Sequence, residues 1–320
     1  MRHSVAAPDK KLSSDVVKHI QRESKIAFNE AFASFTQRRS AVQSIGSVGS
    51  KMPEALLSHM HQNEEFKKAY PKDSRSPREQ IAAVRDREHF KLLKPLKDSP
   101  SARALILTPR ILADQASVIT EERHLQIFGP PYTDQWTSQS TSGNAEVQSL
   151  SANKETGDLG FFMGAADGSA WAGAGIWVQF VPTANTKAQV RAFVPYSYQY
   201  DLDSQVGYTA HNDGGFGVFV LSWDMDGTNR FNDLDYRYTA WSDGTGWWDH
   251  HSNPSFPDHD FGYAYQYGQE APYFDVWTNR VYMACLWGFG SSDAGGGFFG
   301  NAVSASDLNA SVRFVVIGEQ

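Results

Sequence analysis

The feature that most constrains the fold of this chain is an abrupt change in charge and aromatic content along its length. Residues 1–110 carry 21 Lys and Arg against 12 Asp and Glu, a net charge of +9, whereas residues 111–320 carry 8 against 24, a net charge of −16. All nine tryptophans lie in the second part, beginning with Trp136. A joint change of this kind marks a boundary. We therefore predict a basic helical segment over residues 1–100, acting as an arm or docking element, and an acidic, aromatic β domain over residues 101–320.

The basic segment has the apolar spacing of amphipathic helices. A first helix is predicted from Asp15 to about Arg39, with Ser14 available as its N-cap. Small residues over Ser44–Ser50 predict a break and hinge after it. The apolar stripe consists of Val16, Ile20, Ala27, Phe28, Ala31, Phe32 and Phe35.

Two more helices are predicted before the β domain. One runs from Pro53 to about Ala69. The next begins at a capping box in which Ser76 precedes Pro77 and Glu79, and it should end near Lys94.

The acidic part has the composition and punctuation of an all-β domain. Short runs rich in Val, Phe, Tyr and Trp are separated by Gly, Asn, Asp and Pro, and Asp-Gly pairs at 167, 213, 226 and 243 suit tight turns. This pattern predicts a β-sandwich or jelly-roll-like domain. The predicted strands are Ile176–Val181, Gln189–Val194, Gly217–Trp223, Tyr236–Trp241, Arg280–Trp287 and Ala310–Ile317.

One short segment occurs twice in the β domain. The sequence from Tyr208 to Gly214 is similar to the sequence from Tyr238 to Gly244, thirty residues later. The similarity is interpreted either as one strand-end-and-turn unit used twice or as chance, because two copies do not establish a repeat fold.

The best candidate metal site is an acidic stretch with alternating oxygen-bearing side chains around a glycine. Calcium binds several oxygen ligands, and such a turn can supply them. The stretch has neither the final glutamate nor the flanking helices of an EF-hand, so a solvated acidic turn is the alternative. The candidate calcium ligands are Asp224, Asp226, Asn229, Asp233 and Asp235.

A second cluster of His and Asp residues could bind zinc or another transition metal, or act as acid and base. It contains Asp249, His250 and His251, followed by Asp258, His259 and Asp260. Adjacent side chains on an extended strand point to opposite faces, so the two neighbouring histidines cannot readily bind one ion. An exposed polar loop is the favoured interpretation.

Aromatic and acidic residues also mix in a way that suits sugars. Flat rings cover the apolar faces of pyranoses, while carboxylates bind hydroxyl groups; the alternative role for the same rings is a β-sandwich core. The candidate glycan-binding residues are Trp241, Asp243, Trp247 and Trp248.

Other features narrow the classes of protein. The longest apolar runs fall short of the roughly 20 residues of a transmembrane helix. The N-terminus has no signal-peptide apolar stretch, which predicts a cytoplasmic protein or one exported by a leaderless route.

The lone Cys285 excludes an internal disulfide and lies among apolar residues typical of an inert buried thiol. Interspersed acidic residues disfavour nucleic acid as a partner of the basic segment.

The sequence names no catalytic residue. P-loop, dinucleotide-binding, zinc-protease and serine-hydrolase motifs are absent from it. The leading hypothesis is therefore a non-enzymatic β-sandwich that binds a glycan or assembles with other chains, including copies of itself. The alternatives are a carbohydrate hydrolase that uses Asp and His residues of the β domain, and an effector or toxin exported without a leader.

Overall fold

The computed structural model describes two N-terminal helices and twelve strands, over residues 12–48, 75–85, 124–205, 208–246, 249–253, 261–264, 271–295 and 302–320, with Gln62, Glu64 and Lys68. The predicted class, a mainly β protein with helices before the β domain, is confirmed. The elements are α1 (Ser14–Val48), α4 (Pro77–Arg85), β1 (His124–Phe128), β2 (Asp134–Asn153), β3 (Asp158–Phe180), β4 (Thr186–Ser204), β5 (Thr209–Asp224), β6 (Phe231–Thr245), β7 (Asp249–Asn253), β8 (Phe261–Ala264), β9 (Phe274–Val276), β10 (Arg280–Gly295), β11 (Ala302–Ser311) and β12 (Phe314–Glu319).

The strands form a single antiparallel sheet that folds over into two layers. Its order is β1-β12-β4-β11-β3-β10-β5-β6, with β2 beside β3 and with β7, β8 and β9 beside β4. In one layer, here called the helix-side layer, the second half of β3 pairs with β10, and β5 and β6 follow. In the other, the far layer, the first half of β3 pairs with β11, and β4, β12 and β1 follow.

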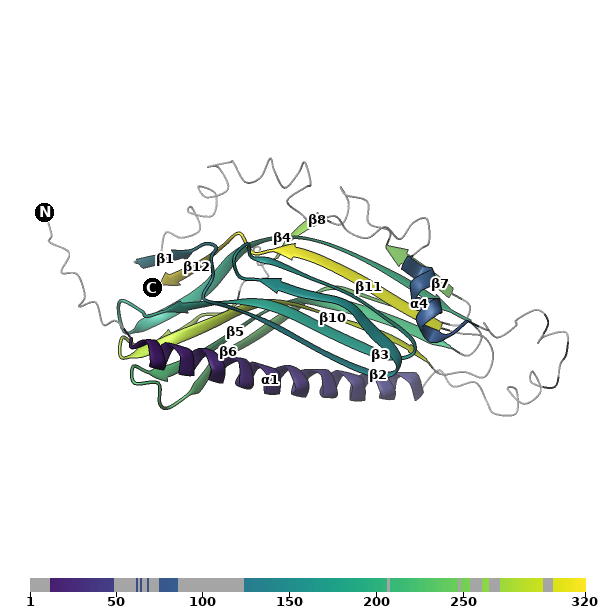
Figure 1. Cartoon of the computed structure of the whole chain (residues 1–320), viewed down its shortest axis with the longest axis horizontal. Helices are drawn as coiled ribbons and strands as arrows, with labels where there is room; N and C mark the ends of the chain where they lie inside the picture. Colours follow the sequence, from purple (N-terminus) through teal and green to yellow (C-terminus); the bar gives the residue numbers. More distant parts are fainter. Residues whose placement is uncertain are drawn as a thin grey trace, which may run out of the picture.

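The β2–β3 ribbon passes from one layer to the other at an irregularity near Asp167. Asp167 and Gly143 have positive φ values of 72° and 61°, and the β2–β3 register shifts beside Gly143. A Cβ on Gly168 would lie 2.3 Å from the backbone oxygen of Ser142, so the two backbones leave no room for a side chain. Figure 1 shows the ribbon turning back at the end of the molecule that carries α4. A bulge of this kind allows one strand to take part in both layers of the sandwich.

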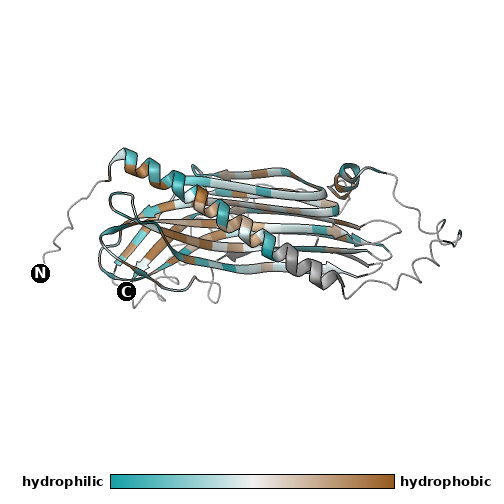
Figure 2. Cartoon of the chain, turned by 90° about the horizontal axis from the view of Figure 1, so that it is seen from below, coloured by the Kyte–Doolittle hydropathy of each residue, from teal (hydrophilic) through white to brown (hydrophobic). Residues whose placement is uncertain are grey.

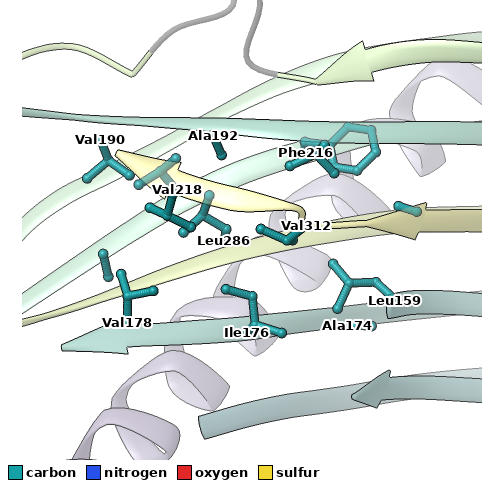
Figure 3. Close-up of a cluster of buried hydrophobic side chains, with 14 of the residues drawn as sticks. Leu159, Ala174, Ile176, Val178, Val190, Ala192, Phe216, Val218, Leu286 and Val312 are labelled. Carbon is teal, nitrogen blue, oxygen red and sulfur yellow. The ribbon is translucent and has the colours of Figure 1, made fainter. Parts of the chain in front are cut away.

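The bulge also keeps apolar residues inside the sandwich. Before it, odd-numbered residues of β3 such as Phe161 and Met163 face the core, and after it even-numbered residues such as Ala174 and Ile176 do so. Figure 3 shows side chains of β3, β4, β5 and β10 converging between the layers. The inward-facing residues before and after the bulge therefore belong to one apolar cluster.

Several small side chains lie in the core toward the end where the ribbon turns. Alanines from four strands meet there: Ala165, Ala210, Ala294 and Ala302. Close by, the hydroxyl oxygens of Ser292 on β10 and Ser306 on β11 lie 3.2 Å apart across the two layers. Small side chains at this end allow the layers to approach each other.

Helix α1 covers the outer face of the helix-side layer, crossing it diagonally (Figures 1 and 2). Its predicted apolar stripe is confirmed, with Ile20, Phe28 and Phe32 fully or almost fully buried. The N-cap is Ser13 rather than the predicted Ser14, since the Ser13 hydroxyl accepts a hydrogen bond from the Val16 backbone N–H. The predicted break over Ser44–Ser50 is wrong for residues 44–48, through which the helix continues.

Helix α4 begins as its capping box predicts. The Ser76 backbone N–H donates to Glu79 Oε2 at 2.7 Å, and the Glu79 N–H donates to Ser76 Oγ at 3.3 Å. Ile81 and Val84 pack on Phe162 and Val303, at the end of the sandwich where the ribbon turns. Residues 86–94, where this helix was expected to continue, lie outside the described part. Of the helix predicted over Pro53 to Ala69, only Gln62, Glu64 and Lys68 are described, and they are helical.

Each predicted strand falls on an observed strand, but most of the real strands are much longer. The prediction of a single strand over Ala310–Ile317 is wrong, because a short break after Ser311 separates β11 from β12. Three of the four Asp-Gly pairs lie inside strands rather than in turns; only Asp226-Gly227 forms one, between β5 and β6. The two similar segments are not copies of one turn, because residues 209–214 and 238–244 lie within the neighbouring strands β5 and β6.

In the part of the chain that the structure describes, no helix is long and apolar enough to cross a membrane.

Candidate functional site

An aromatic layer joins α1 to the sheet. Phe28 lies 4.3 Å from Trp136 and 5.1 Å from Trp287 between ring centroids, both in edge-to-face geometry. Phe35 extends this layer to Trp171. Aromatic pairs of this kind add about 0.5–1.5 kcal/mol each beyond the area they bury. Cys285 lies in the same layer, and burial raises the pKa of its thiol well above the ordinary value, as its apolar sequence context predicts.

Three tryptophans in this layer lack a hydrogen-bond partner for the indole nitrogen. The Nε1 atoms of Trp171, Trp177 and Trp287 are buried and have no acceptor within the described residues. Trp136 differs, since its Nε1–H donates to Asn29 Oδ1 on α1 at 2.8 Å. A buried donor without an acceptor costs about 1–3 kcal/mol. The contact of α1 with the sheet therefore rests on apolar packing and is weakened by unpaired donors.

Charged contacts add little to the attachment of α1. Lys25 Nζ lies 2.9 Å from Asp134 Oδ2, with the lysine side chain 40% exposed. The Arg237 guanidinium lies over the Phe35 ring at 4.2 Å. Exposed ion pairs contribute about 0–1 kcal/mol. Because α1 packs against it, the outer face of the helix-side layer is covered in this structure.

The first part of the acidic stretch predicted to bind calcium forms the turn between β5 and β6. Its carboxylates accept hydrogen bonds from residues of the turn and from Arg280 on β10. Asp224 accepts hydrogen bonds from Arg280 Nη1 at 2.9 Å and from Asn229 Nδ2 at 2.7 Å. The Asp226 carboxylate accepts two bonds from Thr228, and these bonds lower the pKa of Asp226. Gly227 and Asn229 have positive φ values, which suits a tight turn.

The remaining two predicted calcium ligands lie on β6. Burial raises the pKa of the Asp233 carboxyl, while the Ser222 hydroxyl and Arg280 act in the opposite direction. Asp235 accepts from Arg237 Nη2 at 2.6 Å. Among the described residues, no group of three or more His, Cys, Asp and Glu side chains is placed to hold a metal ion. Calcium binding stays a prediction for this turn.

Of the four predicted glycan-binding residues, the structure describes Trp241 and Asp243. Trp241 is 5% exposed, stacks on Tyr198 at 4.6 Å and donates from Nε1 to Asn212 Oδ1. Asp243 accepts from the Tyr200 hydroxyl at 2.8 Å. Trp247 and Trp248 lie outside the described residues. Trp241 is packed as a core side chain, and glycan binding by these four residues stays a prediction.

The predicted acid–histidine cluster is only partly described. The backbone of β7 pairs with β4 so that His250 lies opposite Asp203 and Ser252 lies opposite Asp201. Asp258, His259 and Asp260 lie outside the described residues. Hydrolysis by this region therefore also stays a prediction.

The edge strand β1 exposes apolar side chains that sequence reasoning missed. Ile127 is 63% and Leu125 43% exposed, and both lie on the outer face of the far layer, opposite Val316 and Gly318 of β12. On the other face, Gln126 Nε2 donates to Glu319 Oε1 and to the Val181 carbonyl, each at 2.9 Å. Gln126 thus anchors β1, while the side chains of Leu125 and Ile127 on its other face are exposed to solvent. The alternation of Leu125, Gln126 and Ile127 was the available signal, but one short run does not show which face is covered.

Two other edges carry features that block further pairing, and β1 does not. β6 has two register shifts and the charged pair Asp235–Arg237, and β2 also has two register shifts. β1 pairs with β12 over five consecutive residues without a shift, and within the described residues it has no other partner. Bulges and charges are the usual means by which proteins prevent strands from adding to an edge. Of the edges β1, β2 and β6, β1 is the one with an unshifted register, and it has no second partner strand within the described residues.

Comparison with known proteins gives weak structural matches. No family model matches the sequence, and no curated protein matches it. Among solved structures, a mutant VP2 protein of infectious bursal disease virus in T=1 particles aligns with 62% of this chain and 36% of its own, at 10% identity and a TM-score of 0.16. Structures of the Gx and Gt strains of infectious bursal disease virus also align with 62% of this chain, and with 39% and 42% of their own chains. Their TM-scores are 0.12 and 0.15 and their identities 8% and 10%.

These alignments span less than half the length of the viral chains. Scores this low do not show a shared fold, and the β-sandwich assignment rests on the strand pairing of this chain itself.

Proposed function

We propose that this protein is a β-sandwich building block that associates with copies of itself through the free edge of β1. The observation that supports the proposal is the contrast between β1, which is regular and apolar, and the edges β2 and β6, which are interrupted by bulges. Unpaired backbone groups on a regular edge are a template for a further strand.

The simplest arrangement is an antiparallel pair of β1 strands related by a two-fold axis at Gln126. Leu125 then lies opposite the partner's Ile127, and the apolar faces of the two far layers become continuous. Directly opposed side chains of this kind contribute roughly 0.2–1 kcal/mol per pair. Five residues per copy form a small contact, so the association is reversible and depends on protein concentration.

In this proposal α1 covers its own chain and does not connect neighbours. Its aromatic face is filled by the helix-side layer of the same molecule. The side of α1 that faces solvent carries one large exposed apolar residue among those described, Ile26 at 44%.

The test is the mass of the full chain by light scattering over a range of concentrations, for the unmodified protein, Ile127→Lys and the control Ile26→Lys. We expect the unmodified protein and the control to gain mass with concentration and Ile127→Lys to stay a monomer, because a lysine on an edge opposes strand addition. A monomer for all three proteins, or equal association of all three, contradicts the proposal.

A further inference from the structure

Exposed side chains form a row along β9, on the outer face of the far layer. Residues alternate between exposed and buried from Tyr273 to Trp277: Tyr273, Asp275 and Trp277 are exposed, whereas Phe274 and Val276 are buried in the core. Two aromatic rings therefore flank a carboxylate on one face of an edge strand. Side chains four residues apart on a strand are separated by roughly 13 Å.

The backbone that carries this row is fixed at several points. The Trp277 N–H donates to the Tyr282 hydroxyl at 2.9 Å, and the Trp277 carbonyl accepts from the Arg280 N–H at 3.0 Å. The next residue, Thr278, donates its N–H to Asn185 Oδ1 at 2.7 Å. Tyr282 is itself fully buried and stacks on Phe180. Trp277 is thus held on a rigid turn while its side chain remains 43% exposed.

Charged and polar groups of β4 lie beside the row. Lys187 lies opposite Asp275 in the register and is also exposed. Carboxylates accept hydrogen bonds from hydroxyl groups, ammonium groups donate to hydroxyl oxygens, and flat aromatic rings cover apolar ring faces. Together these groups match the surface of a pyranose, which has an apolar face and a hydroxyl-bearing rim.

We infer that the row Tyr273–Asp275–Trp277, with Lys187, is a binding site for an extended chain of pyranose rings. The two aromatic rings stack on separate sugar rings, and Asp275 and Lys187 bind the hydroxyls of the sugar between them. The fixed backbone at Trp277 lowers the entropic cost of binding, since this turn need not be ordered when the sugar arrives. The site is separate from the residues proposed above for self-association, because β4 and β12 lie between β9 and β1.

The test is isothermal titration of the full chain with three soluble hexasaccharides: cellohexaose, chitohexaose and laminarihexaose. The variants are Trp277→Ala, Asp275→Asn and the control Phe231→Ala, which removes another exposed aromatic ring, 54% exposed, on β6. We expect at least one sugar to bind, Trp277→Ala to weaken its binding by more than tenfold, Asp275→Asn to weaken it severalfold and the control to leave it unchanged.

Three outcomes overturn the inference. The first is no binding of any of the three sugars at millimolar concentration. The second is sugar binding that Trp277→Ala leaves intact. The third is a protein that binds no sugar but whose self-association is lost in Trp277→Ala, which would assign the row to a contact between chains. A circular dichroism spectrum and a thermal transition that match those of the unmodified protein establish that each variant is folded.

Discussion

At the scale of single residues, the polar groups near the β5–β6 turn show how far sequence reasoning reaches. The acidic turn itself was predictable, because Asp226-Gly227 and the polar residues around it favour a tight turn. Its electrostatic partner was not, since Arg280 lies about fifty residues further along the chain and reaches Asp224 only through the pairing of β10 with β5. Trp241 was open to two interpretations in the sequence, and its stacking on Tyr198 comes from the fold.

The Asp233 carboxyl gives a prediction for the pH dependence of stability. Because burial raises its pKa above the ordinary 3.8 in the folded protein, the folded state holds this proton more tightly than the unfolded state. Asp233 therefore stabilises the fold below that ordinary value, and the contribution is lost as the pH rises through the raised pKa.

In urea unfolding between about pH 3 and pH 7, the free energy of unfolding of the unmodified protein, taken relative to that of Asp233→Asn, should therefore fall as the pH rises. The control Asp226→Asn should act with the opposite sign, since the pKa of Asp226 is lowered and its contribution is lost as the pH falls. Identical pH profiles for the unmodified protein and Asp233→Asn would show that the carboxyl is not perturbed.

At the scale of elements, the helices were easier to predict than the strands. The stripe of α1 and the capping box of α4 are local signals, and both are confirmed. No strand was predicted in β2 because most of its residues are polar. The strand on β3 was predicted too short because the middle of β3 is rich in Gly and Ala, residues with little strand preference of their own. Pairing with neighbours on both sides, rather than propensity, holds β3 in place.

The aromatic layer predicts that α1 separates from the sheet before the sandwich unfolds. The helix is held on one face and leaves three indole donors without acceptors, whereas β10 is paired on both sides by β3 and β5. Hydrogen exchange followed by mass spectrometry should show faster amide exchange in residues 14–38 than in residues 281–289.

Phe28→Ala should widen this difference, because loss of a buried Phe costs about 3–5 kcal/mol. The control Ile26→Ala, on the exposed side of α1, should not change it. Equal protection of α1 and β10 in the unmodified protein would mean that the helix is an integral part of the core.

At the scale of the whole molecule, the class of fold was predictable but its construction was not. Composition and punctuation predict a sandwich, while the passage of β3 between layers depends on a bulge at Asp167 and a close backbone contact at Gly168. The sequence shows an Asp-Gly pair there, which predicts a turn as readily as a bulge. The position of β1 at one end of the strand order is likewise a property of the fold that the sequence does not show.

The measurement that tests self-association most directly is disulfide trapping between copies with cysteines on β1. In the proposed two-fold pair Leu125 lies opposite the partner's Ile127, whereas two copies of either residue are diagonal neighbours, about 7–8 Å apart. A disulfide needs Cβ atoms about 3.5–4.5 Å apart. The native Cys285 is fully buried, so it does not compete.

Oxidation of an equal mixture of Leu125→Cys and Ile127→Cys proteins should give a cross-linked dimer that contains one copy of each, and either protein alone should stay largely monomeric. No cross-link in the mixture, or equal cross-linking in all three samples, would contradict association through β1.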